Sequence, residues 1–190
     1  QRYYAIDNTD DERCLRIIKK LSEYGVFQTP TLTINTFDSR RFYADPEWRE
    51  TYSELPEAAK EDWMNGSLNL AEIDATEDAL KFDAWSLALV KIMHAEGVKI
   101  IAGTDTPIGY LTPGYSLHKE LELLSEAGLS NLEVLKSATI TPAEFFGIED
   151  QMGTIEVGKL ADLVILNDNP LESISNTQKI HKVIAKGEIQ

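Results

Sequence analysis

The sequence predicts an α/β protein with two parts, and two patterns indicate this. Over residues 1–147, amphipathic helix patterns alternate with short apolar runs. Such alternation is typical of parallel strands joined by crossover helices. Residues 148–190 instead carry β-branched residues punctuated by glycine and asparagine, which predicts a small β segment. We therefore expect the chain to divide near residue 147.

The composition excludes several classes of partner. The chain has 190 residues, of which 43% are hydrophobic, enough for a packed core. Its net charge of -14 argues against nucleic acid and an anionic membrane surface, which both attract clustered Lys and Arg. Its apolar runs are shorter than the roughly 18 residues that span a bilayer. The single cysteine, Cys14, excludes an intrachain disulfide. The default expectation is a cytoplasmic protein, but the chain starts with Gln and an upstream signal peptide stays open.

The first third of the chain predicts a helix and then a strand. Thr9-Asp10-Asp11-Glu12 fits a capping box, and Gly25 marks the end of the helix that follows. The run Val26–Ile34 predicts a strand, in which Pro30 indicates an edge or a strand end.

Residues 35–75 predict a helical insertion. Asp45-Pro46 fits an N-cap with proline at the first helical position, and Pro56 is expected to open a short helix through Trp63. The insertion is too long for a plain loop. A lid over one end of the fold and a simple packing element are both open interpretations.

The remaining helices are predicted from their caps. We expect one at residues 76–96, closed by Gly97, and one at 116–127, closed by Gly128. Capping boxes are predicted at Ser130–Glu133 and Thr141–Glu144. The second box would have Pro142 at the first helical position, and its helix would end at Gly147. The run Val98–Gly103 predicts a strand buried on both faces.

Asp105 is the leading candidate for chemistry. It follows the Val98–Gly103 strand, and parallel α/β sheets bind ligands at the carboxyl ends of their strands. The alternative, that Asp105 only caps the following turn, is equally compatible with the spacing. Among the histidines, only His118 is expected near Asp105. His94 is expected at the opposite end of the sheet, and His181 on an exposed strand. A catalytic zinc needs about three protein ligands, and no CxxC, HxH or HExxH motif supplies them.

Three stretches in order resemble the C-terminal part of the amidohydrolase superfamily. They are "KIIAGTDTP", "GYSLHKELELLSEAGLSNLEVLKSATITPAEFFGI" and "GTIEVGKLADLVILNDNPLESI", and "GVFQTPTLT" resembles the preceding strand. The imidazolonepropionase-like and prolidase-like members are the most similar. The resemblance implies the C-terminal portion of a (β/α)8 TIM-type barrel over residues 1–147, with the insertion at about 35–75. Residues 148–190 would then be part of a small β-sandwich domain.

The resemblance also implies a role for Asp105. It matches the eighth-strand carboxylate, which binds a divalent metal, zinc by family expectation. That carboxylate accepts a proton from the metal-bound water and passes it to the leaving nitrogen. Thr31 would lie near the end of the seventh strand. Thr31, Thr106 and His118 are the candidate substrate-binding residues.

The family's other metal ligands are absent. The paired histidines of the first strand, the bridging carboxylate or carboxylated lysine, and two single histidines have no match. By this resemblance the chain begins after the sixth strand, and two strands do not close a barrel. We therefore predict part of a metal-dependent hydrolase of C–N bonds in a small amide, cyclic amide or dipeptide-like substrate. It would be inactive without the rest of the barrel.

Two alternatives stay open at this point. One is a non-catalytic half-barrel that binds a partner or forms a homo-oligomer through its exposed edges. The other is a plain α/β binding domain in which Asp105 is a turn cap.

Overall fold

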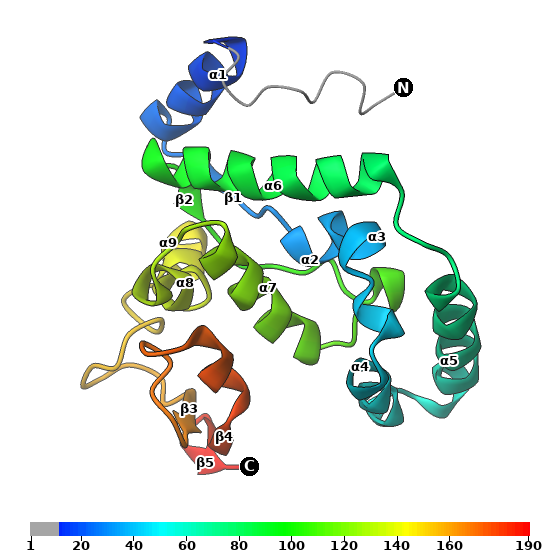
Figure 1. Ribbon diagram of the computed structural model, residues 1–190. Coiled ribbons are helices and arrows are strands. Elements are labelled where there is room, and N and C mark those ends of the chain that lie inside the picture. The colour runs from blue at the N-terminus through cyan, green and yellow to red at the C-terminus, as the bar shows by residue number, and fades with distance from the viewer. Residues whose placement is uncertain (1–11) are drawn as a thin grey trace.

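A computed structural model describes residues 12–190 (Figure 1). Its strands are β1 (Phe27–Gln28), β2 (Lys99–Ile100), β3 (Leu163–Leu166), β4 (Ile180–Ala185) and β5 (Glu188–Ile189). Its α-helices are α1 (Glu12–Glu23), α2 (Leu32–Asn35), α3 (Phe37–Arg40), α4 (Pro46–Glu50), α5 (Glu57–Ala71), α6 (Glu77–Ala95), α7 (Tyr115–Glu126), α8 (Asn131–Ser137) and α9 (Ile140–Phe146). Short 3-10 helices are η1 (Phe42–Ala44), η2 (Thr51–Glu54), η3 (Ile108–Tyr110) and η4 (Ile174–Gln178).

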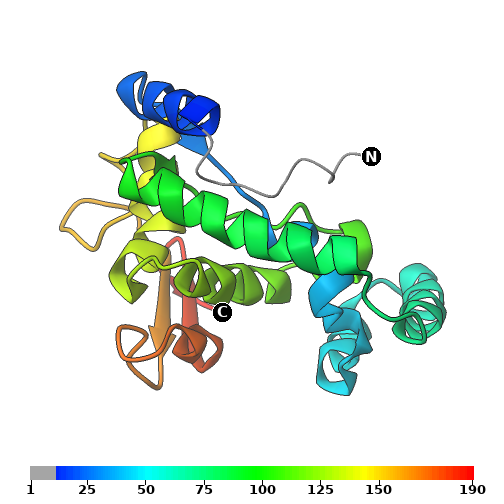
Figure 2. The ribbon, with the colours of Figure 1, turned by 45° about the horizontal axis from the view of Figure 1, so that its top comes forward.

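The two strands of the helix-rich part are parallel. Phe27 pairs with Lys99 and Gln28 with Ile100. The chain between them contains α6, which lies alongside α7 in both views (Figures 1 and 2). The predicted α/β class is therefore confirmed, including the parallel pairing.

Both strands are much shorter than predicted. The expected strand Val26–Ile34 is wrong beyond Gln28, because Pro30 offers no N–H for pairing and Thr31 takes a left-handed φ of 47°. The chain then turns into α2. The expectation that Val98–Gly103 is buried on both faces is also wrong. Val98 and Ile100 are buried, but Lys99 is exposed and pairs with Glu144 at 2.6 Å.

Several helix starts agree with the sequence. The Asp45 side chain accepts the amide of Glu47, with Pro46 at the first helical position. The Ser130 capping box is complete, because the Ser130 side chain accepts the Glu133 amide and the Glu133 side chain accepts the Ser130 amide. The predicted Thr9 box lies outside the described residues.

Two helix predictions are wrong. The helix opened by Pro56 does not stop at Trp63 but continues to Ala71. The Thr141–Glu144 box does not form, since α9 begins before it at Ile140. Pro142 is tolerated there because amides in the first helical turn have no partner within the helix. Gly147 ends α9 with a φ of 66°, as predicted.

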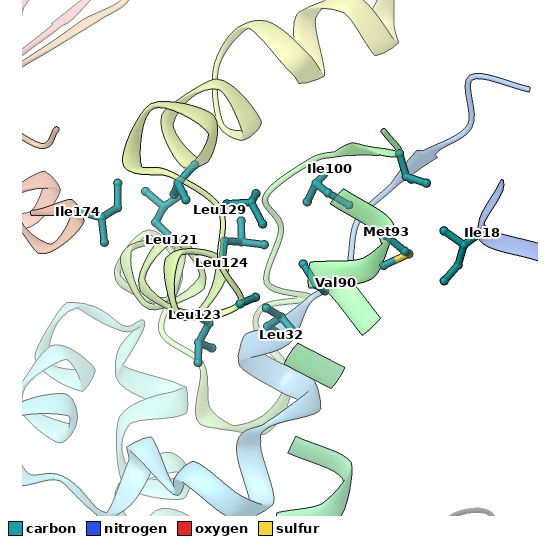
Figure 3. Packing of buried hydrophobic residues seen from close by; sticks show 13 residues of the cluster. Ile18, Leu32, Val90, Met93, Ile100, Leu121, Leu123, Leu124, Leu129 and Ile174 are labelled. Carbon is teal, nitrogen blue, oxygen red and sulfur yellow. The ribbon is translucent and has the colours of Figure 1, made fainter. Parts of the chain in front are cut away.

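The main core lies where α1, α2, α6, α7 and α8 meet. Figure 3 shows its side chains gathered between α6 and α7, with Ile18 of α1 at one side and Ile174 of η4 at the other. The buried members are Ile18, Leu32, Val90, Met93, Val98, Ile100, Leu121, Leu123, Leu124, Ala127, Leu129, Val134 and Ile174. Through Leu32, Val98 and Ile100, this core packs the chain around β1 and β2 against α6 and α7.

The insertion packs as a separate aromatic cluster at the end of the molecule away from β3–β5 (Figures 1 and 2). Its buried residues are Trp48, Tyr52, Leu55 and Leu111. The Trp48 indole Nε1 donates to the Tyr110 carbonyl at 3.0 Å. The insertion therefore rests on the loop that follows Asp105.

The C-terminal segment forms one antiparallel three-stranded sheet in the order β3–β4–β5. The predicted β segment is present, although η4 lies between β3 and β4 where no helix was expected. Within residues 12–190, no helix combines the length and apolar character that a bilayer crossing requires.

Candidate functional site

Asp105 lies in the loop that leaves β2, and its side chain is exposed. Its φ of 57° is in the left-handed region, which aspartate enters more readily than most residues. Its carbonyl accepts the amide of Ile108 at 3.3 Å. The preceding Thr104 is buried, and its Oγ1 accepts the amide of Thr106 at 3.4 Å. This turn holds the backbone while the Asp105 carboxylate faces solvent.

The exit of β1 lies directly against this loop. A Cβ on Gly103 would stand 2.6 Å from Cγ2 of Thr29, so only glycine lets the two strand exits approach this closely. Thr31, two residues further on, is half-buried. The structure thus brings the Thr31 segment and the Asp105 loop to one edge of the parallel pair.

The other sequence candidates have defined partners. The Thr106 hydroxyl donates to the Leu111 carbonyl and closes the Asp105 loop. The His118 Nδ1 lies 3.0 Å from Thr177 Oγ1 in η4, which ties α7 to the C-terminal segment. Burial lowers the pKa of His118, while Glu122 acts in the opposite direction. The ring is therefore mainly neutral at pH 7.

The other two histidines lie on α6 and β4. His94 Nε2 lies 3.1 Å from a Glu133 carboxylate oxygen and links α6 to α8. His181 is exposed on β4.

Glu120 is the residue that sequence reasoning missed. It sits on α7, has no exposed surface and accepts three hydrogen bonds from Leu32 and Thr33. Burial raises the pKa of its carboxyl to about 7, and the hydrogen bonds from Thr33 and Leu32 oppose that rise. The only signal in the sequence is an acidic residue among the leucines of an amphipathic helix, which by itself does not name a partner.

The described residues do not build a metal site alone. Within residues 12–190, no group of three or more His, Cys, Asp and Glu side chains lies close enough to hold a metal ion. Asp105 supplies one carboxylate, and a catalytic zinc needs about three protein ligands. These residues therefore do not fit a resident metal without further ligands.

The fold and the site define an α/β protein whose parallel strands end beside an exposed carboxylate. A sequence profile of the amidohydrolase family matches residues 7–190. The chain therefore belongs to the amidohydrolase family.

Individual relatives and solved structures match different shares of the chain. The chain resembles a solved Xaa-Pro dipeptidase with bound methionine at 25% identity and a TM-score of 0.65, over 95% of this chain and 37% of that one. It is 39% identical to the imidazolonepropionase of Symbiobacterium thermophilum over 72 residues, which are 37% of this chain and 17% of the relative. A 5-methylthioadenosine/S-adenosylhomocysteine deaminase of Thermodesulfovibrio yellowstonii is 32% identical over 114 residues, 52% of this chain and 24% of the relative. The matched regions thus span well under half of each relative.

Proposed function

We propose that residues 1–190 are the C-terminal part of a metal-dependent hydrolase that cleaves C–N bonds in small amide, cyclic amide or dipeptide-like substrates. The observation that carries this proposal is the exposed Asp105 carboxylate at the exit of β2, beside the exit of β1, in a chain of the amidohydrolase family. Similarity to a dipeptidase and a deaminase supports it, because both names denote attack at a carbon–nitrogen bond.

In this proposal residues 1–147 are the last strands and helices of a (β/α)8 barrel, and residues 148–190 are part of a β-sandwich. The open edges of a two-stranded parallel sheet support a missing covering partner, because two strands do not close a barrel, and exposed apolar side chains are compatible with one. Those exposed by more than half include Tyr24, Phe146, Ile155, Val157 and Ile189. The rest of the barrel would come from residues outside 1–190, in the same polypeptide or in a second chain.

Asp105 would supply one ligand of a divalent metal, with zinc as the first choice, and the other ligands would come from outside the described residues. Asp105 would also accept a proton from the attacking water and deliver it to the leaving nitrogen. Thr31 and Thr106, at the same edge, are proposed to contact substrate, with His118 as a further candidate.

The test compares the 190-residue chain with a complete enzyme that includes the rest of the barrel. We expect the short chain to hold far less than one metal ion per molecule and to hydrolyse no dipeptide. The complete enzyme should hold metal and hydrolyse an Xaa-Pro dipeptide or another small amide. Full metal occupancy and hydrolysis by residues 1–190 alone would contradict the proposal that they are incomplete.

The exposed apolar side chains also suit a second function, in which the chain is a non-catalytic self-association module. Sedimentation equilibrium separates the two. A tight homo-oligomer that binds no metal and has no active complete form would favour the module.

A further inference from the structure

A buried carboxylate holds the segment that leaves β1. The Leu32 amide donates to Glu120 Oε1 at 2.9 Å, and the Thr33 amide donates to Oε2 at 2.7 Å. The Thr33 hydroxyl also donates to Oε2, at 2.6 Å. Both carboxylate oxygens therefore bind one short stretch of backbone that lies 87 residues earlier in the chain.

This arrangement is specific to a carboxyl group, whose two oxygens can both accept hydrogen bonds whether or not the group is protonated. Burying a carboxyl group is unfavourable unless its oxygens receive hydrogen bonds. Here two of the three donors are backbone amides at the start of α2, which have no partner within that helix. A glutamine would offer only one acceptor oxygen and would turn an NH2 group toward one of these amides. Glu120 and the Leu32–Thr33 backbone therefore fix each other.

The clamped segment contacts the Asp105 loop on both sides of Asp105. Before Asp105, Thr29 lies against Gly103. After it, Ile34 Cδ1 would stand 2.8 Å from a Cβ on Gly109. The residues that Glu120 holds lie between Thr29 and Ile34. A shift of this segment would therefore move both of its contacts with the loop.

We propose that Glu120 is a positioning residue: it locks the Thr29–Ile34 segment so that Thr31 and the Asp105 loop keep a fixed separation. This inference deepens the proposed function and rests on it for its catalytic consequence. It does not depend on that function for the mechanical coupling between Glu120 and the Asp105 loop.

Amide hydrogen exchange of the 190-residue chain tests the coupling. The variants are Glu120→Gln, Thr33→Val, which removes one donor, and the control Glu122→Gln on the same helix. In Glu120→Gln we expect exchange about ten-fold faster at Leu32 and Thr33, the cost of one weakened buried hydrogen bond. The acceleration should extend to Ile108 and Leu111, whose amides close the Asp105 loop. Leu129, which closes the other end of α7, should stay within about two-fold.

The exchange rates at the loop amides and at Leu129 decide the result. Unchanged exchange at Ile108 and Leu111 would overturn the proposal, because Glu120 would then not be coupled to the Asp105 loop. An equal acceleration that includes Leu129 would also overturn it, because the substitution would then only destabilise the whole fold. If Glu120→Gln fails to fold, Thr33→Val is judged by the same pattern at smaller amplitude. Glu122→Gln should leave all four loop and segment amides unchanged.

Activity of the complete enzyme tests the catalytic consequence. Glu120→Gln should lower kcat about ten-fold or more at unchanged metal content, and Glu120→Asp should recover part of that loss. A kcat of Glu120→Gln equal to that of the wild-type enzyme would overturn the positioning role. A complete enzyme with no activity would overturn the proposed function instead, and the exchange pattern would still decide the coupling.

Discussion

The titration of Glu120 makes the stability of this chain depend on pH in an unusual direction. Burial raises the pKa of this carboxyl from 4.5 to about 7. Between these values the folded chain keeps a proton that the unfolded chain has released. Stability contributed by this group is therefore fully present below about pH 4.5 and is lost as pH rises through about 7. Most structural carboxylates, whose pKa is lowered by folding, give the opposite slope.

The magnitude follows from the pKa. At about 1.4 kcal/mol per pH unit, the full rise is worth about 3 kcal/mol. About 2 kcal/mol of this falls between pH 5.5 and 8, a range that avoids precipitation near the sequence pI of about 4.6. Because Glu120 has no exposed surface, solvent screening does not reduce this figure much.

Urea unfolding at pH 5.5 and pH 8 measures the effect in the wild-type chain, in Glu120→Gln and in the control Glu122→Gln. Urea is uncharged, so it leaves the charge interactions unscreened. The free energy of unfolding should fall from pH 5.5 to 8 by about 2 kcal/mol more in the wild type and the control than in Glu120→Gln. An equal pH slope in the wild type and Glu120→Gln would refute the assignment of this titration to Glu120.

Three other predictions concern the packing that supports the site, each measured by urea unfolding at pH 7.5. Arg40 binds Asp83 at 2.5 Å and Glu126 at 2.7 Å, and so joins α3 to α6 and α7. Arg40→Ala should lower the free energy of unfolding by about 2 kcal/mol. A loss below about 0.5 kcal/mol would show that water replaces these ion pairs. Ser130→Ala should cost about 1 kcal/mol through loss of the capping box, with Ser130→Thr as the control that keeps it. Leu124→Ala should cost about 3 kcal/mol, because Leu124 is fully buried, and an unchanged unfolding midpoint would contradict the described core.

The parts of the fold that local chemistry determines were predictable. The Ser130 capping box, the Asp45 N-cap with Pro46, and the glycine end at Gly147 each depend on a few neighbouring residues, and all three form. The alternation of helices with parallel strands also follows from periodicity. The position of Asp105 at the exit of β2 follows from that alternation.

The parts that long-range contacts determine were not predictable. The run Val26–Ile34 has strand composition, but the donors of Leu32 and Thr33 are taken by Glu120, far along the chain, and the segment turns into α2. No sequence pattern near Leu32 predicts its contact with Glu120. His118 was expected near Asp105, yet its hydrogen bond goes to Thr177, because η4 packs on α7. Its substrate role stays a prediction.

In the proposed function, Asp105 is the essential carboxylate of a C–N bond hydrolase. The most direct test is hydrolysis of a small amide or dipeptide by the complete enzyme carrying Asp105→Ala, beside the control Asp150→Ala, which removes an exposed aspartate in the turn after α9. Asp105→Ala should lower kcat about a thousand-fold or more. Because alanine is less favourable than aspartate at a φ of 57°, the variant should also lose about 1 kcal/mol of stability, too little to explain such a loss of kcat, and the control should keep normal activity. Full activity of Asp105→Ala would contradict this catalytic role and leave Asp105 as a turn residue.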